Sequence, residues 1–384
     1  MRWMLITETY PPEVNGAAIT LSQLAEGLVA RGHHVHIVRP TRDKNDKAVK
    51  PPGNPTHSLV LGVPFLWCEG IRIGIPYLGQ LKREIEKFKP DVMHIATEGW
   101  LGLAGVMAAN YYKVPVVSSY HTNFFAYSRF YGLGFLRSMG YWYFRWLHNC
   151  TRKTFVPSKT TQTQLQSYKF KNLEIMSRGC DTDRFSPSRR REALKKLWGA
   201  RAEDPVMLYV GRIAPEKNIR LLIKCYERIK EKIPSAKLVF VGDGPEKKSL
   251  EREYPEVIFA GMKIGTELAE YFASADLFVY PSVTETYGRV TTEAMASGLV
   301  VLAYDYAAAK ENIQNGVNGY LAPYRKEHEF LKRFDELLKE RDKWGEISHR
   351  AAASMKENTW ENVVAKYEQS ILGFCKPSKA ATHA

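Results

Sequence analysis

The chain has 384 residues, of which 45% are hydrophobic and 25% charged, a composition typical of a globular protein with a sizeable core. Its five cysteines are scattered and odd in number, which indicates neither a disulfide framework nor a zinc site, and we expect no metal. The apolar runs are too short for a signal-peptide core or a membrane-spanning helix, so we expect a cytoplasmic protein, soluble or peripheral to a membrane.

Positive charge is concentrated in the first half of the chain. The formal net charge is +14 at pH 7. Residues 1–190 contain 25 basic and 13 acidic side chains, a net of +12, whereas residues 191–384 contribute only +2. This asymmetry predicts that one domain faces a polyanion, either nucleic acid or an anionic membrane. The alternative is a charge that serves solubility and has no partner.

In chain order, the predicted elements alternate between strands and helices. An apolar strand at 3–7, a loop with two prolines, a helix at 18–30 and a strand at 34–38 open the pattern. The following strands and helices continue it: strands at 92–95, 114–120, 154–156 and 173–176, and helices at 101–112 and 159–168.

A polar, arginine-rich stretch at 181–191 interrupts the alternation, and we interpret it as a linker. The pattern then restarts, with strands at 205–210, 236–241, 257–260 and 277–280 and helices at 218–233, 246–254 and 266–273. Two α/β domains with open parallel sheets follow from this alternation. Ligands of such sheets bind beyond the carboxyl ends of the strands, so we expect the active site in a cleft between the domains.

We predict four segments along the chain: a domain at 1–185, a domain at 186–360, a helix at 361–375 that packs back toward the first domain, and a disordered tail at 376–384.

The stretch 280–298 has the densest chemical signal. A strand ends near Pro281, a loop carries Glu285, a helix begins near Gly288, and Glu293 lies inside that helix. Amide groups at a helix N-terminus bind phosphate or sugar hydroxyls, and carboxylates accept hydroxyl hydrogen bonds. Glu285 can alternatively be a capping acid, and Glu293 a solvated helix residue.

A second block has a strand, a glycine turn, and two cations five positions apart. Arg212 and Lys217 can converge on a diphosphate and neutralise the charge that grows as it leaves. The alternative is a pair of surface cations. We interpret the glycines of the turn at 241–245 as conformational.

Two further candidate site residues lie in the first domain. Gly16, in the loop after the first strand, would let backbone approach a phosphate or an acceptor. This loop has no G-x-G-x-x-G, so a dinucleotide oxidoreductase lacks its fingerprint. His121 follows a buried strand and can donate a hydrogen bond to a sugar hydroxyl. It can also be a structural histidine satisfied by its own loop.

These blocks resemble the signature of the retaining GT-B glycosyltransferases. The hallmark, two glutamates separated by seven residues and then Ala-Met-Ala-x-Gly, occurs at Glu285, Glu293 and 294–298. The Gly-Arg…Glu-Lys-Asn pattern occurs at 211–218, and 179–185 is similar to the segment that joins the two domains in this family. The resemblance runs over most of the chain, with its blocks in the family's order.

The resemblance implies a role for each candidate. Glu285 would contact the donor sugar near its anomeric carbon, Glu293 the ribose, and Arg212 and Lys217 the diphosphate without a metal ion. The donor would also contact the residues at the start of the helix, which are Tyr287, Gly288, Arg289 and Val290. The nucleotide sugar is a substrate, so we expect no cofactor.

The same resemblance implies that Gly16 lies at the donor phosphate or acceptor, and that His121 is the cleft histidine. The chain departs from the family at 307–309, where alanines replace a glycine pair before Glu311. Retention in this family is thought to proceed by front-face attack, in which the leaving phosphate assists the acceptor hydroxyl.

The stretch 124–146 mixes aromatic side chains with arginines. Such a mixture suits a membrane interface, and an aromatic core helix with exposed arginines is the alternative. We therefore expect a lipid, lipid-linked or saccharide acceptor at the cytoplasmic membrane face, and a donor of the GDP-mannose or UDP-glucose type.

Two other classes were considered. A non-hydrolysing sugar-nucleotide epimerase shares the architecture but does not need the Ala-Met-Ala-x-Gly context. A nucleic-acid-binding protein would explain the charge, but no zinc-finger, RNP or helix-turn-helix pattern occurs, so we expect no nucleic acid. The sequence does not indicate an oligomeric state.

Overall fold

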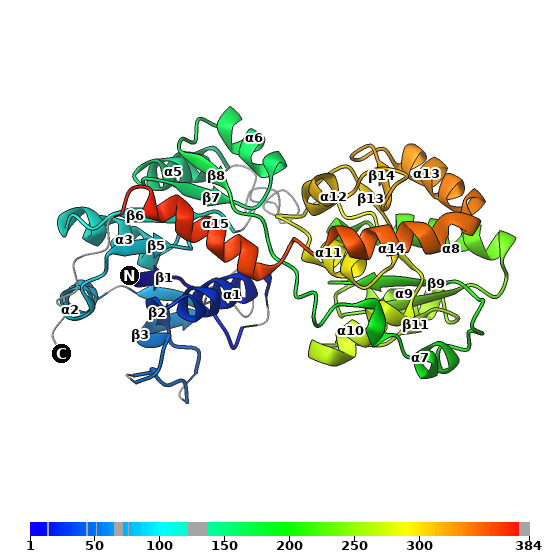
Figure 1. Ribbon diagram of the computed structural model, residues 1–384, viewed down its shortest axis with the longest axis horizontal. Helices are drawn as coiled ribbons and strands as arrows, with labels where there is room; N and C mark the ends of the chain where they lie inside the picture. Colours follow the sequence, from blue (N-terminus) through cyan, green and yellow to red (C-terminus); the bar gives the residue numbers. More distant parts are fainter. Residues whose placement is uncertain are drawn as a thin grey trace. The chain divides into compact units, whose positions relative to one another are not determined.

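The computed structural model describes residues 1–13, 15–43, 45–50, 52–64, 72–75, 77–121 and 137–375. The chain divides into two units: the first comprises Met1–Arg178 together with the chain from Trp360, and the second comprises Gly179–Thr359 (Figure 1). In the described ranges, no helix is both long and apolar enough to cross a membrane.

A parallel sheet forms the centre of the first unit, in the order β4-β3-β2-β1-β5-β6-β7-β8. Only β4 runs antiparallel to its neighbour, β3, among the described strands. The inner strands are buried at nearly every position, because helices cover both faces of a parallel sheet. Their bounds are β1 Arg2–Ile6, β2 His34–Pro40, β3 Thr56–Pro64, β4 Arg72–Ile75, β5 Val92–Ile95, β6 Val116–Ser119, β7 Thr154–Val156 and β8 Leu173–Ile175.

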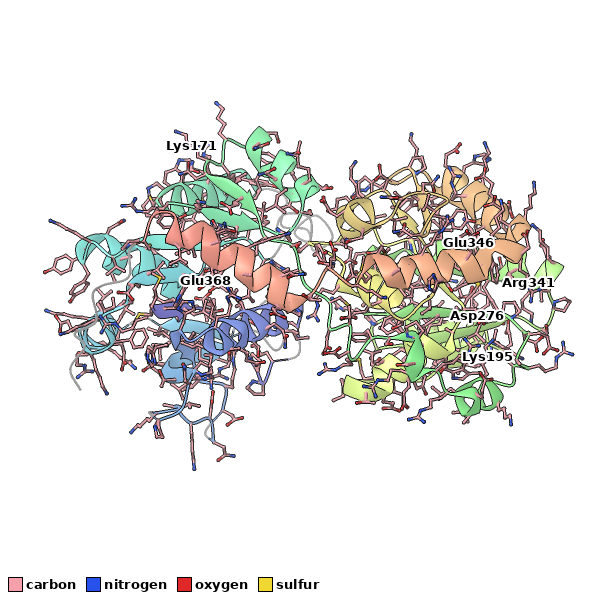
Figure 2. All side chains as sticks on the ribbon, in the orientation of Figure 1. Lys171, Lys195, Asp276, Arg341, Glu346 and Glu368 are labelled. Atoms are coloured by element: carbon pink, nitrogen blue, oxygen red, sulfur yellow. The ribbon has the colours of Figure 1, made fainter. Side chains whose placement is uncertain are left out.

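The helices of the first unit include one from the far end of the chain. Helix α15 (red in Figure 1) lies against α1, and a Cβ on Gly27 would come within 2.6 Å of Val364, so the missing side chain permits close approach. Glu368, labelled in Figure 2, pairs with Arg31 at 2.5 Å and His33 at 2.7 Å. The helix bounds are α1 Gly16–Ala30, α2 Leu78–Phe88, α3 Trp100–Tyr111, α5 Arg137–Asn149, α6 Lys159–Ser167 and α15 Trp360–Leu372.

The second unit has a six-stranded, fully parallel sheet in the order β11-β10-β9-β12-β13-β14. In chain order within the unit this is 3-2-1-4-5-6, the doubly wound arrangement of nucleotide-binding domains. Its strands are β9 Val206–Val210, β10 Lys237–Val241, β11 Ile258–Phe259, β12 Leu277–Tyr280, β13 Val300–Tyr304 and β14 Tyr320–Ala322. Its helices are α7 Glu192–Leu197, α8 Ile219–Lys232, α9 Lys247–Glu253, α10 Gly265–Ser274, α11 Arg289–Ala296, α12 Ala307–Asn312, α13 Glu327–Lys339 and α14 Trp344–Ser354.

A buried ion pair supports the edge of this core. Figure 2 labels Lys195 on α7 and Asp276 before β12, whose Nζ and Oδ2 atoms lie 2.9 Å apart. The side chain of Lys195 is almost fully buried, and it also donates to the carbonyls of Ala202 and Asp204. A buried ammonium needs such partners, because an unpaired charge in the interior is costly.

The two α/β domains with parallel sheets confirm the predicted fold class. The boundary between the units falls after Arg178 and not at the predicted residue 185. Phe185 is buried with its ring 5.7 Å from that of Phe272, and the amide of Cys180 donates to Asn358, so this polar-looking stretch belongs to the second core. The predicted tail at 376–384 lies outside the described residues.

Sequence periodicity missed several elements of the first unit. Strands β3 and β4 and helix α2 were not predicted, because β3 mixes polar, glycine and proline residues and is only partly buried. Residues 124–136 of the aromatic stretch 124–146 lie outside the described residues, and residues 137–146 belong to α5.

Candidate active site

The topology of each sheet has one switch point, where the strand order reverses. These points lie between β1 and β5 in the first unit and between β9 and β12 in the second. Gly16 follows β1, Arg212 follows β9 and Glu285 follows β12. Ligands of doubly wound sheets bind at the carboxyl edge beside a switch point, so the candidate residues lie where such a site is expected in each unit.

Three side chains of the second unit hold the carboxylate of Glu285. Its Oε1 accepts hydrogen bonds from Lys217 Nζ at 2.5 Å, Tyr280 Oη at 2.7 Å and Ser282 Oγ at 2.7 Å. The backbone carbonyl of Glu285 accepts from Tyr306 Oη at 2.9 Å. These contacts hold the carboxylate in one place on a short loop, which favours a binding role over simple helix capping.

Burial and charge act on Glu285 in opposite directions. Desolvation raises the pKa of its carboxyl, but Lys217 lowers it, and hydrogen bonds from Ser282 and Tyr280 lower it further, so the pKa lies below its ordinary value. Glu285 is therefore ionised at neutral pH. An anionic carboxylate can accept hydrogen bonds from two sugar hydroxyls, or stabilise positive charge that develops nearby.

The two cations pair with different glutamates. The Lys217 side chain is nearly buried beside Glu285, whereas the Arg212 side chain is 54% exposed and lies 3.5 Å from Glu216. The position of Lys217 follows from a short 3-10 turn, Pro215–Lys217, after which Asn218 takes a left-handed conformation and opens α8. The predicted convergence of both cations on a diphosphate remains a prediction.

Glycines bring two loops of the second unit into backbone contact. A Cβ on Gly242 would lie 2.0 Å from the carbonyl oxygen of Gly211, and one on Gly244 would lie 2.2 Å from that of Ile213. Gly242 also has a φ of +136°. The turn at 241–245 therefore supports the loop of Arg212, in keeping with a conformational role for its glycines.

Helix α11 begins directly after Gly288, which has a φ of +85° and precedes the first-turn residues Arg289 and Val290. The first amide groups of a helix have no intrahelical acceptor, so this terminus can bind an anion. A small pocket adjoins it and is lined by residues that include Tyr280, Glu285, Tyr287, Gly288, Tyr304 and Tyr306.

Glu293 lies one turn into α11 and is not a solvated residue. Its side chain is 11% exposed, and its Oε1 lies 3.3 Å from Arg289. Burial raises the pKa of its carboxyl above the ordinary value, although Arg289 and Arg184 act to lower it. The solvated alternative is therefore wrong, and a role in binding the ribose stays a prediction.

One of the alanines that replace the family's glycine pair has an unusual backbone. Ala307 has a φ of +50°, a left-handed conformation that glycine adopts without cost. The adjacent amide of Ala308 donates to the carbonyl of Tyr287 at 2.7 Å, and this bond ties α12 to the loop before α11. Ala307 is therefore in a conformation that favours glycine.

In the first unit, Gly16 is the first residue of α1. The helix is capped by Asn15, whose side chain accepts from the amide of Ala18 at 2.8 Å. A Cβ at Gly16 would have no described atom within 4 Å, and its φ is not positive. Among the described residues, the protein's own packing does not require glycine here, so close approach of a ligand stays a prediction.

His121 follows β6 and is buried, with both ring nitrogens engaged. Nε2 lies 2.6 Å from Ser119 Oγ, and Nδ1 lies 3.1 Å from an Arg178 guanidinium nitrogen. Burial lowers the pKa of His121 well below its ordinary value, and the cation of Arg178 lowers it further, so the ring is neutral. It cannot act as a general acid at neutral pH.

Sequence reasoning missed a carboxyl pair at the switch point of the first unit. Glu8 follows β1 and accepts from the amide of Leu101, while Glu98 follows β5 beside it. Burial raises the pKa of Glu8 to about 7, and the charge of Glu98 adds to the shift. The position of Glu8 directly after the first strand is the sequence feature that could have identified it.

Comparison with known proteins decides the family. Residues 190–358 match the family described as "Glycosyl transferases group 1", and residues 14–184 match the family described as "Glycosyltransferase Family 4". A GDP-mannose-dependent alpha-mannosyltransferase of Corynebacterium glutamicum is 30% identical, covering 98% of this chain and 93% of the relative. The chain belongs to the glycosyl transferases group 1 family.

Further similarities fit this glycosyltransferase. An alpha-monoglucosyldiacylglycerol synthase of Streptococcus pneumoniae is 29% identical, covering 88% of this chain and 78% of the relative. A solved structure of sucrose-phosphate synthase from Thermosynechococcus elongatus superposes with a TM-score of 0.79 at 20% identity, covering 97% of this chain and 98% of that chain. The fold of the glycosyltransferase is therefore GT-B, as the motifs predicted.

Proposed function

We propose that this glycosyltransferase is a retaining, metal-independent hexosyltransferase. It moves a sugar from a nucleotide diphosphate of the GDP-mannose or UDP-glucose type to a lipid, lipid-linked or saccharide acceptor at the cytoplasmic face of a membrane. The observation that carries the proposal is the ion pair of Lys217 and Glu285, held by hydroxyl groups beside the N-terminus of α11.

In the proposed donor complex, the amide groups at the start of α11 and the cations of Arg212 and Lys217 bind the diphosphate. Charge accumulates on this group as the sugar leaves, so donors that are already in place stabilise the transition state more than the ground state. Glu285 accepts hydrogen bonds from the sugar, and Glu293 from the ribose diol. The leaving phosphate takes the proton of the attacking acceptor hydroxyl.

The identity of the donor and acceptor is supported by relatives. The Corynebacterium protein is named for GDP-mannose, which favours GDP-mannose over UDP-glucose. The Streptococcus relative is named as a synthase of a glucosyl diacylglycerol, which favours a lipid acceptor. Such an acceptor would be reached from the surface of a bilayer.

Exposed apolar side chains of the first unit support contact with a membrane. Helix α5 exposes Met139, Trp142 and Trp146, and their spacing places them on one helical face. Helix α3 exposes Trp100 and Tyr111. Aromatic rings and apolar side chains on a basic unit fit the headgroup region of an anionic bilayer.

The test is thermal stability in the presence of UDP, GDP and ADP and their sugars, with and without EDTA. A ligand that binds only the folded state raises the free energy of unfolding, by about 2.7 kcal/mol when its concentration is 100 times the dissociation constant. The melting temperature rises as a result. We expect GDP or GDP-mannose to give the largest rise, with EDTA making no difference. Loss of the rise in EDTA would contradict the metal-independent mechanism.

The matched variants are Arg212→Ala and Arg220→Ala, because both arginine side chains are 54% exposed and each pairs with a glutamate. Only Arg212→Ala should abolish the rise. A rise that persists in Arg212→Ala would place the diphosphate elsewhere. No rise with any nucleotide would contradict the proposal, and isomerisation of a sugar nucleotide without an acceptor would indicate an epimerase.

A further inference from the structure

A continuous chain of buried hydrogen bonds leads from the C-terminal helix to His121. Tyr367 Oη on α15 lies 2.8 Å from His94 Nδ1, His94 Nε2 lies 2.7 Å from Ser119 Oγ, and Ser119 Oγ lies 2.6 Å from His121 Nε2. Arg178 closes the chain at His121 Nδ1. Each of these five residues is 9% exposed or less, so water does not compete for the bonds.

The protons of His121 can be assigned from the chemistry of its partners. A guanidinium group has donors and no acceptor, so Nδ1 of His121 must accept from Arg178. A neutral imidazole then carries its proton on Nε2, and Nε2 donates to Ser119. The cation of Arg178 and the burial of the ring both oppose a second proton.

The other end of the chain is held equally firmly. The ring of Tyr367 packs 5.4 Å from Trp3 and 4.7 Å from Phe155. His94 pairs in register with Leu5 of the central strand, and burial keeps the pKa of its ring at about 3. This chain of hydrogen bonds therefore joins β5, β6 and α15, although Tyr367 and His94 are 273 positions apart in the sequence.

We propose that Tyr367, His94 and Ser119 are positioning residues that, with Arg178, hold His121 as a neutral imidazole protonated on Nε2. This inference rests on the proposed function and adds to it a contact between His121 and a hydroxyl group of the substrate. It deepens that function, because the one N–H group of the ring is then committed to Ser119. A sugar hydroxyl can only donate to Nδ1, in place of Arg178, so His121 acts as an acceptor and not as the predicted donor.

The role of Tyr367 is tested with Tyr367→Phe, which removes only the hydroxyl group. Tyr226→Phe is the matched control, because Tyr226 is equally buried. Its hydroxyl donates to a backbone carbonyl of the second unit and takes no part in the chain of hydrogen bonds to His121. Ser119→Ala is a second variant that breaks the chain next to His121. Thermal unfolding of each variant shows whether it is folded.

The first readout is the ring nitrogen-15 spectrum of the full chain without substrate. We expect His121 to be neutral and protonated on Nε2 from about pH 5.5 to 8. Ser119→Ala should shift the Nε2 signal, because the Nε2–H group loses its acceptor while Arg178 still requires Nδ1 to accept. Tyr367→Phe should shift this signal less, whereas Tyr226→Phe should not differ from the wild type. A wild-type ring protonated on Nδ1, or one that titrates near 6.5, would overturn the inference.

The second readout is turnover. We expect kcat to fall about 10- to 100-fold in Ser119→Ala and Tyr367→Phe, with the KM for the donor little changed, because misplacement of a reacting group by about 1 Å has effects of this size. A shifted Nε2 signal with unchanged kcat would overturn the positioning role. Stabilisation by nucleotide should persist in both variants, so failure of this inference is distinguishable from failure of the proposed function.

Discussion

Glu285 and Lys217 show how a single residue pair sets the chemistry of the site. They are 68 positions apart and meet at 2.5 Å, where the cation outweighs the burial that would otherwise raise the pKa of the carboxyl. The pair keeps an anion and a cation in a nearly buried place. Each partner can then bind a different part of a nucleotide sugar.

Replacement of Lys217 by methionine should lower kcat/KM about 10²- to 10³-fold, because one fixed charge near the leaving diphosphate is lost. Steady-state kinetics with the nucleotide sugar found by thermal shift measures the effect. Lys224→Met is the control, since Lys224 is exposed and pairs loosely with Glu327 at 3.9 Å. Equal activity of the two variants would argue against a donor-binding role for Lys217.

The same variant has a predicted effect on stability against pH. The folded pKa of Glu285 lies below its unfolded value, so its contribution to stability is present above pH 4.5 and is lost as the pH falls through the folded pKa. In Lys217→Met the folded pKa rises toward the unfolded value, so the contribution that is lost in acid becomes smaller. Urea unfolding from about pH 3 to 7 measures this difference between the variant and the wild type.

The contribution of Glu8 to stability changes with pH in the opposite direction. Its folded pKa of about 7 exceeds the unfolded 4.5, so the folded state binds a proton more readily and loses stability as the pH rises from 4.5 to 7. Glu8→Gln should therefore be more stable than the wild type at pH 8, by on the order of 2 kcal/mol, and similar at pH 5. Urea unfolding at both values checks this, with the exposed Glu26→Gln as control. Equal effects at both pH values would contradict it.

Helix α12 begins with a residue in a conformation that its side chain disfavours. Ala307 has a left-handed backbone at the first position of the helix, and the following amide bonds to the loop of Tyr287. The surrounding contacts outweigh a local cost of about 1 kcal/mol.

Ala307→Gly should stabilise the protein by about 0.5 to 1 kcal/mol, because glycine adopts this φ without strain. Ala309→Gly, in the same helix at an ordinary φ, should instead destabilise it by about 1 kcal/mol. Urea unfolding compares the two variants. Destabilisation of similar size in both would show that Ala307 is unstrained.

The whole molecule combines a basic, apolar-faced first unit with a nearly neutral second half. Vesicles with anionic phosphatidylglycerol should bind the protein at low salt and release it at about 0.5 M salt, where screening is strong. Vesicles of neutral phosphatidylcholine should bind it weakly. No binding to anionic vesicles at low salt would remove the membrane from the proposal.

The double variant Trp142→Ser/Trp146→Ser should weaken this binding about 10- to 30-fold, since each ring buries apolar surface worth on the order of 1 kcal/mol. Met262→Ser/Ile264→Ser is the control, because these exposed apolar residues belong to the second unit. Sedimentation with vesicles measures both. Equal loss in the two double variants would indicate a nonspecific effect.

The sequence by itself determined the alternation of strands and helices, the two α/β domains and the motifs of Glu285, Glu293, Arg212 and Lys217. These depend on local periodicity and on short spacings, which a linear chain displays directly. Partly buried strands near the edge of the sheet, such as β3, were missed for the same reason, since their pattern is weak.

Only the tertiary structure decided which partners those residues meet. It joined Lys217 to Glu285, placed Phe185 in the second core, and brought Tyr367 of α15 to His94. Each contact spans a long sequence separation. Lys217 meets Glu285 because the second sheet brings the ends of β9 and β12 to one edge, whereas Phe185 and Tyr367 meet their partners through packing that involves the helices α10 and α15. Burial and neighbouring charge then set the protonation of each group, and neither quantity can be read from spacing along the chain.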